Sequence, residues 1–326
     1  MIVDPATTKV TRRDGVETLL LSDAGGLRQF GCHIETLPPG TWSSQRHWHS
    51  AEDEFLYILS GTVTLHDDAG ETELFPGDAV CWRHGDPNAH HLTNRGDTPA
   101  RYIILGSRAA GDICTYPDSG DRQVNSDTRW QVIAADGTIR RQGDLPETLL
   151  NLTARWGRAF DGIRMPQVLP AGSVKPEVCA NNYPAQWSDL GLSEDIALSD
   201  AGGLTQFGAF LEFLHPGGQS SLRHWHEAED EFLYVLSGEV TLLENDGPHP
   251  IGPGTCVCWP KGQPNAHALR NDGPGPATLF IVGTRLPEDA CHYPDIDLHY
   301  TRRNGQRAFA TKAGTPYPGW PKETNR

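Results

Sequence analysis

The chain has 326 residues, enough for two domains with separate cores, because a single core rarely grows past about 250–300 residues. Its formal charge is −15, and no cluster of lysine and arginine supplies the basic face that nucleic-acid binding requires. No apolar stretch approaches the roughly 18 residues of a membrane span or resembles a signal-peptide core, and the seven cysteines are an odd number that suits buried thiols better than disulfides. These features predict a soluble, cytoplasmic protein that binds neither nucleic acid nor membranes.

Short apolar runs closed by turn residues follow one another along the first half. They lie at 54–60, 62–66, 79–82 and 101–105, next to glycine, proline or aspartate turns. No stretch sustains the 3.6-residue period of an amphipathic helix, and the 35 glycines and 25 prolines fit a chain with many tight corners. The pattern predicts an all-β sandwich or barrel.

The second half repeats the first at a constant offset of 177 residues. Segment 46–65 recurs at 223–242, segment 21–27 at 198–204, and segment 116–118 at 293–295. Because the offset never changes, we expect both copies to have the same strand lengths and turns. The predicted organisation is an N-terminal domain at 1–138, a linker that also extends the second barrel at 139–197, and a C-terminal domain at 198–326.

The repeated segment contains side chains that bind metals. His47 and His49 are two residues apart, so on a strand they project from one face. Glu54 opens the next strand and His90 follows a turn, so antiparallel pairing brings all four side chains to one barrel interior. The same geometry is predicted for the second set, which is His224, His226, Glu231 and His267.

Three neutral imidazoles and one carboxylate fill four corners of an octahedron around a divalent cation and leave two corners open. A substrate can then chelate the metal while dioxygen or water binds beside it. Nitrogen and oxygen ligands suit Fe(II) or Mn(II), which this chemistry favours, and also Ni(II), Co(II) or Zn(II). An isolated His-x-His pair is often a core or surface feature, but a set of four ligands that occurs twice predicts one metal ion in each half.

The spacing of ligands and glycines resembles the two sequence motifs of the cupin superfamily. The second half contains Gly217, Gly218, His224-x-His226-x4-Glu231-x6-Gly238, then Gly254-x5-Pro260-x-Gly262-x4-His267-x3-Asn271. The first half contains His47, His49, Glu54, Gly61, Gly77, Gly85, His90 and Asn94. The resemblance implies a bicupin, with two tandem double-stranded β-helix (jelly-roll) barrels related by internal duplication. Each half is also similar to cupins that carry the name sugar-phosphate isomerase.

The two halves differ at a few positions near the motifs. The first half has the more polar residues there, which leaves room for a division of labour between the halves; alternatively, Arg83 and His91 face solvent, which strand parity favours for His91. Arg46 and Arg223 are expected to pair with the acidic residues at 52–53 and 229–230. The differing positions are Gln45, Arg83 and His91 in the first half and Leu222, Pro260 and Ala268 in the second.

Three functions fit these residues. The first is a metal-dependent oxidoreductase, most plausibly a dioxygenase, acting on a small chelating molecule, with Glu54 and Glu231 as ligands that also take up a proton. The second is an isomerase or lyase in which the metal stabilises an enediolate, although no lysine or arginine is clearly directed inward to hold a phosphate. The third is a non-catalytic barrel that binds a metal and a ligand. Exposed strand edges also predict a homodimer.

Overall fold

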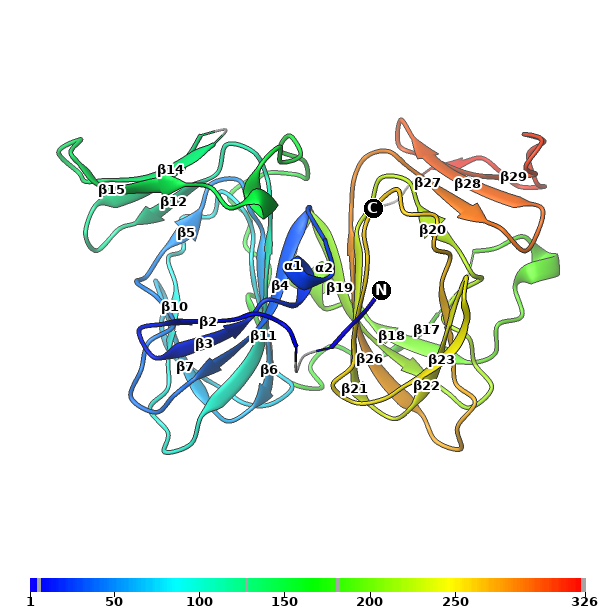
Figure 1. The fold of residues 1–326 in the computed structure, drawn as a ribbon, viewed down its shortest axis with the longest axis horizontal. Coiled ribbons are helices and arrows are strands. Elements are labelled where there is room, and N and C mark those ends of the chain that lie inside the picture. The colour runs from blue at the N-terminus through cyan, green and yellow to red at the C-terminus, as the bar shows by residue number, and fades with distance from the viewer. Residues whose placement is uncertain (5–6, 127, 180–181, 324–326) are drawn as a thin grey trace. The chain divides into compact units, whose positions relative to one another are not determined.

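The computed structural model describes residues 1–4, 7–126, 128–179 and 182–323, and it is almost entirely β (Figure 1). Its α-helices are single turns, α1 (Leu21–Ala24) and α2 (Leu198–Ala201), and two 3-10 turns lie at Glu147–Leu149 and Ala185–Trp187. The predicted all-β fold of two tandem jelly-roll barrels is confirmed. None of the helices among the described residues has the length and apolar character needed to cross a membrane.

The first barrel is built from three antiparallel sheets. The large sheet has the order β16 (Val168–Leu169), β9 (Ala79–Trp82), β6 (Glu54–Ser60), β11 (Ala100–Ser107), β4 (Phe30–Leu37), β3 (Val16–Leu19) and β2 (Val10–Arg13). A small sheet has the order β10 (His91–Thr93), β7 (Val63–Asp67) and β8 (Gly70–Leu74). The third has the order β15 (Ile139–Asp144), β14 (Arg129–Ile133), β13 (Asp121–Asn125), β12 (Ile113–Tyr116) and β5 (Trp48–His49).

The second barrel repeats this plan. Its large sheet has the order β1 (Ile2–Val3), β24 (Cys256–Trp259), β21 (Glu231–Ser237), β26 (Ala277–Thr284), β19 (Phe207–Leu214), β18 (Ser193–Ile196) and β17 (Glu177–Val178). The small sheet has β23 (Gly247–Ile251), β22 (Val240–Glu244) and β25 (Ala268–Arg270). The third has β20 (Trp225–His226), β27 (Asp289–Tyr293), β28 (Leu298–Arg303), β29 (Gln306–Ala310) and β30 (Lys322–Glu323). Most of these strands have the lengths of their first-half counterparts, as the constant offset predicts.

The compact units do not follow the predicted ranges of 1–138, 139–197 and 198–326. One unit comprises Met1–Pro5, Lys175–Ala197 and Ala209–Arg326, and the other comprises Ala6–Val174 and Leu198–Gly208. Short edge strands explain the difference. β1 pairs with β24 of the second barrel through Ile2↔Val257, whereas β16, from the expected linker, pairs with β9 of the first barrel through Val168↔Val80. Comparison of the repeats identifies duplicated residues, but it does not show which barrel an edge strand joins.

Residues 198–208 complete the first barrel through a buried polar network. The Asp53 carboxylate accepts backbone N–H hydrogen bonds from Thr205 and Gln206 at 2.7 and 2.9 Å, and His84 Nδ1 lies 2.5 Å from its other oxygen. Asp53, His84 and Gln206 are fully buried. Burying an unpaired carboxylate is costly, so these bonds are the physical reason that this segment belongs to the first unit.

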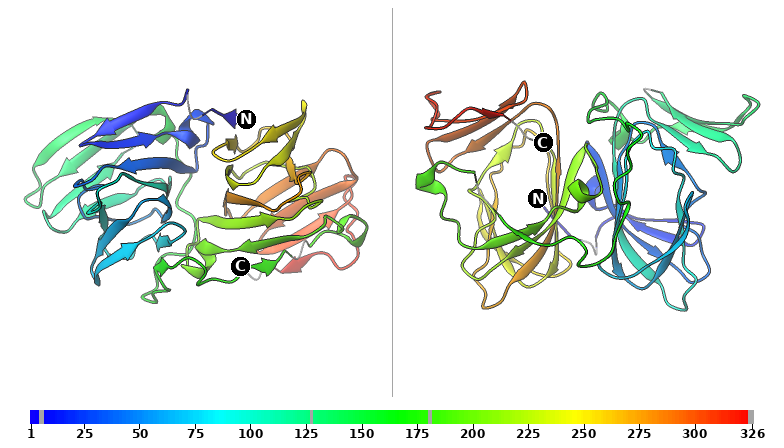
Figure 2. Two further views of the ribbon diagram at one scale, coloured as in Figure 1. Left: turned by 90° about the horizontal axis from the view of Figure 1, so that it is seen from below. Right: turned by 180° about the vertical axis from the view of Figure 1, so that it is seen from behind.

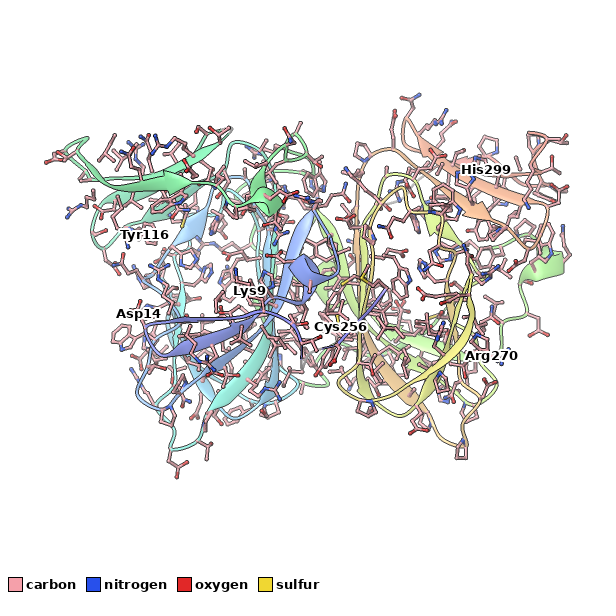
Figure 3. The ribbon with its side chains drawn as sticks, in the orientation of Figure 1. Lys9, Asp14, Tyr116, Cys256, Arg270 and His299 are labelled. Atoms are coloured by element: carbon pink, nitrogen blue, oxygen red, sulfur yellow. The ribbon has the colours of Figure 1, made fainter. Side chains whose placement is uncertain are left out.

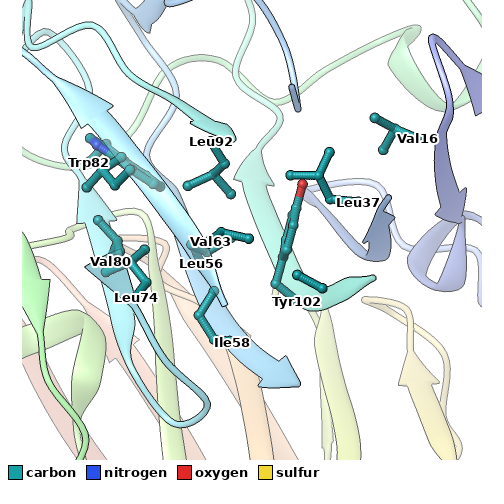
Figure 4. Packing of buried hydrophobic residues seen from close by; sticks show 12 residues of the cluster. Val16, Leu37, Leu56, Ile58, Val63, Leu74, Val80, Trp82, Leu92 and Tyr102 are labelled. Carbon is teal, nitrogen blue, oxygen red and sulfur yellow. The ribbon is translucent and has the colours of Figure 1, made fainter. Parts of the chain in front are cut away.

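Each barrel has an apolar core at one end of its interior. In the first barrel, Figure 4 shows this cluster around Leu56 and Tyr102, and the equivalent second cluster is centred on Leu233 and Val257. The strands of each unit wrap around their own interior in both views of Figure 2. The cysteines are free thiols, as their odd number predicts. The homodimer stays a prediction.

Candidate metal centres

The four ligands predicted for the first barrel come together at one end of its interior. His49 lies in β5 and Glu54 begins β6, while His47 and His90 face each other across a two-way backbone bridge of 3.1 and 2.9 Å. His90 Nε2 lies 3.1 Å from Glu54 Oε2. The Nε2 atoms of His47 and His49 each lie 3.8 Å from Glu54 Oε1.

The other ring nitrogen of each histidine has a partner on the protein. His47 Nδ1 lies 2.8 Å from the Gln45 carbonyl oxygen, and His90 Nδ1 lies 3.3 Å from that of Asn88. His49 Nδ1 lies 2.6 Å from Asp112 Oδ2. When Nδ1 carries the proton in such a bond, Nε2 is left as the basic nitrogen. The three Nε2 atoms and the carboxylate therefore fit a divalent cation.

The second barrel reproduces this arrangement. His267 Nε2 lies 3.0 Å from Glu231 Oε2, and His226 Nε2 lies 3.6 Å from Glu231 Oε1. His224 Nδ1 contacts the Leu222 carbonyl oxygen at 2.8 Å. His226, Glu231 and His224 form one of the groups whose ligand atoms all lie within 4.8 Å of one another. The structure thus places every predicted ligand in one of two matching clusters.

The ligand carboxylates lie among histidines that keep them ionised. Burial raises the pKa of Glu54, but His49 and His90 oppose it and hold that pKa well below its usual range. Burial likewise raises the pKa of Glu231, and His226 and His267 hold it below its usual range. An ionised carboxylate is the form that binds a metal.

A second layer of acidic side chains lies behind the ligands and differs between the barrels. Glu52, near Asp112 and His49, accepts the Ala109 N–H at 3.0 Å, and burial and Asp112 raise its pKa to about 8. Its counterpart Glu229 accepts hydrogen bonds from the Leu286 N–H and the Arg302 guanidinium. Burial raises the pKa of Glu229 to about 7 while Arg302 lowers it. Arg302 therefore places a positive charge beside Glu229. Its counterpart in the first repeat is Asn125, which is uncharged, so Glu52 has no equivalent partner at that position.

The first ligand set opens onto a cavity of about 230 Å³. Glu35 of β4 and Tyr102 of β11 lie on the cavity wall, directly opposite each other in the strand register, and the Tyr102 hydroxyl donates a 2.8 Å hydrogen bond to Glu35 Oε2. The remaining lining residues are Ser43, Ser44, His47, Glu54, Leu56, Trp82, His90, His91, Leu92 and Ile104. A small organic molecule in this cavity lies beside the ligands.

The family is shown by comparison with known proteins. The model of the cupin domain matches residues 33–106 and 210–283. Over 113 residues the chain is 33% identical to the tetracenomycin polyketide synthase protein TcmJ of Streptomyces glaucescens, a match that covers 32% of this chain and 73% of TcmJ. The chain belongs to the cupin family. It contains two cupin domains, so it is a bicupin.

Solved structures support the same fold. An oxalate decarboxylase of Lactobacillus farciminis in complex with formate has a TM-score of 0.53 and 15% identity, over 87% of this chain and 86% of the other. A cupin-superfamily sugar phosphate isomerase of Silicibacter pomeroyi is 38% identical over 45% of this chain and 94% of the other, with a TM-score of 0.42. The first of these two structures shows that the chain shares the cupin fold over most of its length. Cupins commonly bind a divalent metal, and the two ligand clusters of this bicupin have the donors for one.

The second site of the bicupin has a more apolar surrounding. Residues equivalent to Gln45, His33 and Tyr102 of the first repeat are Leu222, Phe210 and Leu279. Above His224 lies an aromatic cluster: the Tyr293 ring is 5.8 Å from the His224 ring, and Tyr183 packs edge-on against Tyr293 at 5.8 Å. The cluster also includes Phe309, Tyr317 and Trp320. In the first barrel, Tyr116, labelled in Figure 3, lies 6.0 Å from His47, but Val132, Arg140 and Gly143 occupy the positions of these three residues.

Two expectations for nearby residues are wrong. His91 is only 7% exposed, because its ring packs against His66 and Trp42 at 4.9 Å each. The Arg83 side chain is 8% exposed and donates to the backbone carbonyls of residues 158 and 159. Strand parity predicts the direction of a side chain, but it does not show whether other segments, such as those that carry Trp42 and residues 158–159, cover that side chain.

The predicted partners of the two motif arginines are also wrong. Arg46 pairs with Asp68 and Asp118, and Arg223 pairs with Asp295 at 2.7 Å. Asp53, Glu229 and Asp230 are instead buried and Glu52 is half-buried, and backbone N–H groups donate to the carboxylates of Glu52 and Asp230. Asp118 and Asp295 belong to the repeated segments at 116–118 and 293–295, so these segments bind the arginine that precedes each His-Trp-His triplet.

Several site residues were not singled out from the sequence. The carboxylate of Asp112 contacts His49 Nδ1, and that of Asp289 contacts His226 Nδ1. The two aspartates are 177 residues apart, so comparison of the repeats could have identified them as candidate site residues. Cys291 Sγ lies 3.2 and 3.5 Å from the two ring nitrogens of His226, hence over the ring face. Glu35 is repeated as Glu212, but its hydrogen bond to Tyr102 has no equivalent, and only the fold brings those two side chains together.

Proposed function

We propose that this bicupin is a metal-dependent enzyme whose first barrel binds a small, chelating organic substrate, and that it acts as an oxidoreductase of the dioxygenase type. The observation that carries this proposal is the position of the cavity. It ends at His47, Glu54 and His90, so a molecule inside it has direct access to the open side of the ligand set. The residues at 47, 49, 54 and 90 would hold the metal, and those at 224, 226, 231 and 267 would hold a second one.

Fe(II) or Mn(II) is the proposed metal, with Ni(II), Co(II) or Zn(II) as alternatives. Held by these residues, Fe(II) or Mn(II) would supply a Lewis acid for a chelating substrate and a redox centre for dioxygen. The protein residues supply the geometry. Trp82 stacks on the His90 ring at 3.8 Å and fixes its plane, and Asp112 fixes that of His49. Leu56, Leu92 and Ile104 line the cavity and limit the water around the substrate.

The name of TcmJ supports a chelating substrate. Polyketide synthase products have carbonyl and phenolic oxygens at regular spacing, and two such oxygens on neighbouring or alternate carbons chelate a divalent cation. The residues lining the cavity include no lysine or arginine, which suits an uncharged or weakly acidic oxygen-rich molecule better than a phosphorylated one. In this proposal the substrate binds through oxygen atoms, and Glu54 and Glu231 are candidates for a ligand that also takes up a proton.

One observation favours a second candidate function. The Glu35 and Tyr102 pair is an acid–base group on the cavity wall, and such a pair suits an isomerase or lyase that moves a proton without oxidation. A dioxygen requirement separates the two functions.

The first test is the metal content of protein purified without chelators or a metal-affinity tag. We expect about two iron or manganese ions per chain by mass spectrometry. Catechols, β-diketones and α-hydroxyketones would then be screened for oxygen uptake, with His49→Ala as the matched control. Turnover of one of these compounds without dioxygen consumption would favour the isomerase or lyase. Iron-loaded or manganese-loaded protein that binds none of them would contradict the proposed substrate class.

A further inference from the structure

Glu35 is a carboxylate on the cavity wall that is not one of the metal ligands. It lies on β4, whereas the ligands come from β5, β6 and the segment before β10. Tyr102 donates a hydrogen bond to its Oε2 at 2.8 Å, and Thr18 of β3 donates one to its Oε1 at 3.2 Å. Both oxygens are thereby held in place, and the carboxylate lines the same cavity as Glu54.

We propose that Glu35, positioned by Tyr102, accepts the proton that a hydroxyl group of the substrate loses when it binds at the first metal site. This inference rests on the proposed function, because it needs a chelating substrate in that cavity. In the step, the substrate O–H bond breaks, the proton goes to a carboxylate oxygen of Glu35, and the electron pair stays on the substrate oxygen. The product of the step is an anionic oxygen ligand and a neutral carboxylic acid.

The need for an acceptor follows from charge. Three neutral imidazoles and one carboxylate leave a divalent ion with a net charge of +1, which favours an anionic oxygen over a neutral hydroxyl. Leu56, Leu92 and Ile104 give the cavity an apolar part, and a side chain on its wall can take the proton directly. The lining carboxylates are Glu54, which is committed to the ligand set, and Glu35.

The surroundings of Glu35 suit this role. Burial raises the pKa of Glu35 above its usual range, although the hydrogen bonds from Tyr102 and Thr18 lower it in part. The carboxylate is therefore a better proton acceptor than an exposed glutamate and still has donors that stabilise its ionised form. Tyr102 is fully buried, and Figure 4 shows its ring standing beside Leu37 in the core, so its hydroxyl is a rigid donor.

The second barrel provides a matched comparison. Its equivalent carboxylate, Glu212, accepts a hydrogen bond from Ser193 and has Leu279 in place of the tyrosine. Glu212 is 4% exposed, and Leu279 offers it no hydroxyl of the kind that Tyr102 gives Glu35. The acceptor role is thus assigned to the first barrel alone.

The test uses 4-nitrocatechol as the probe, because its absorption spectrum distinguishes the bound monoanion from the bound dianion. The full-length chain with His226→Ala, loaded with Fe(II) under nitrogen, has only the first site available. We expect this protein to bind the probe as the dianion at neutral pH. Adding Glu35→Gln should leave the iron content unchanged but give the bound monoanion, or lower the affinity for the dianion by about tenfold, equivalent to ~1.4 kcal/mol.

Two further variants complete the design. Tyr102→Phe removes only the hydroxyl and should give a mixture of the two bound forms, whereas Glu212→Gln should leave the spectrum unchanged. Dianion binding with equal affinity in the presence and absence of Glu35→Gln would overturn the inference and leave the proposed function standing. If the iron-loaded parent does not bind the probe, the proposed function and the inference both fail.

Discussion

The two barrels hold the same four ligands in the same geometry but surround them differently. In the first barrel the ligands meet a cavity of about 230 Å³ whose wall includes Glu35 and Tyr102. In the second, Tyr293 stacks on His224 and Tyr183 packs on Tyr293, and Leu279 takes the position of Tyr102. The two clusters of candidate ligands are therefore alike, while the side chains around them differ.

The difference lies in residues that do not touch the metal. Both repeats share the strand pairing that positions the candidate ligands and their Nδ1 partners. The two ligand clusters are therefore alike wherever the fold is kept. The walls and mouths depend on single side chains and on segments from outside the repeat, such as the one that carries Tyr183. These positions are free to change without loss of the barrel.

The largest expected effect is the loss of one ligand. His49→Ala should empty the first site and His226→Ala the second, each reducing metal content from two ions to one per chain. His49 and His226 are not members of the apolar core clusters, so thermal unfolding of the metal-free protein should change little. Metal analysis and binding of 4-nitrocatechol check this, and the affinity for the probe should fall much further in His49→Ala than in His226→Ala. Full metal content in both variants would show that the ligand assignment is wrong.

A smaller effect is expected from the aspartates behind the ligands. Asp112→Asn and Asp289→Asn keep the size of the side chain but remove the charge that orients His49 or His226. Loss of such an outer partner typically lowers metal affinity by roughly 10–100-fold. Competition with a chelator, measured on chains that retain a single site, checks this. If either substitution lowered the metal affinity of both sites equally, the aspartates would not act on their own site alone, and the prediction would be wrong.

A third prediction concerns the covering of the second site. Tyr183→Ala removes the ring that packs on Tyr293 and Phe309. In a His49→Ala background it should increase the affinity of the second site for 4-nitrocatechol by roughly tenfold, or ~1.4 kcal/mol. Trp187→Ala is the matched control, since Trp187 packs on Tyr317 at the edge of the same cluster. An unchanged affinity would mean that the cluster is structural and does not restrict access.

The smallest effect is on stability and leaves both ligand sets intact. Burial and the neighbouring Asp195 raise the pKa of Glu212 from 4.5 to about 7, so the folded chain retains a proton that the unfolded chain has lost in this interval. Its stabilising contribution is therefore present below about pH 4.5 and is lost as the pH rises toward 7, a change on the order of 1–3 kcal/mol. Glu212→Gln should flatten this decline in urea unfolding measured at several pH values. An identical pH profile in the variant would contradict the assigned pKa.

The sequence was sufficient for the ligands because they are close in the chain and occur twice. His47, His49 and Glu54 fall within eight residues, and strand parity is enough to predict that their side chains lie together. Strand parity did not predict the partners of Arg46, because Asp68 and Asp118 lie in turns distant from it in the chain. It also failed for His91, which is covered by the loop that carries Trp42.

By itself the sequence determined an all-β bicupin with two matching sets of candidate metal ligands, since local spacing and an unbroken repeat decide strand parity and the choice of candidates. Tertiary structure alone decided that β1 and β16 join the barrels they do and that Glu35 meets Tyr102. It also placed Tyr183 against Tyr293, whose ring stacks on His224, although Tyr183 belongs to no repeated segment. These contacts join residues far apart in the chain and differ between the repeats, so neither periodicity nor duplication encodes them.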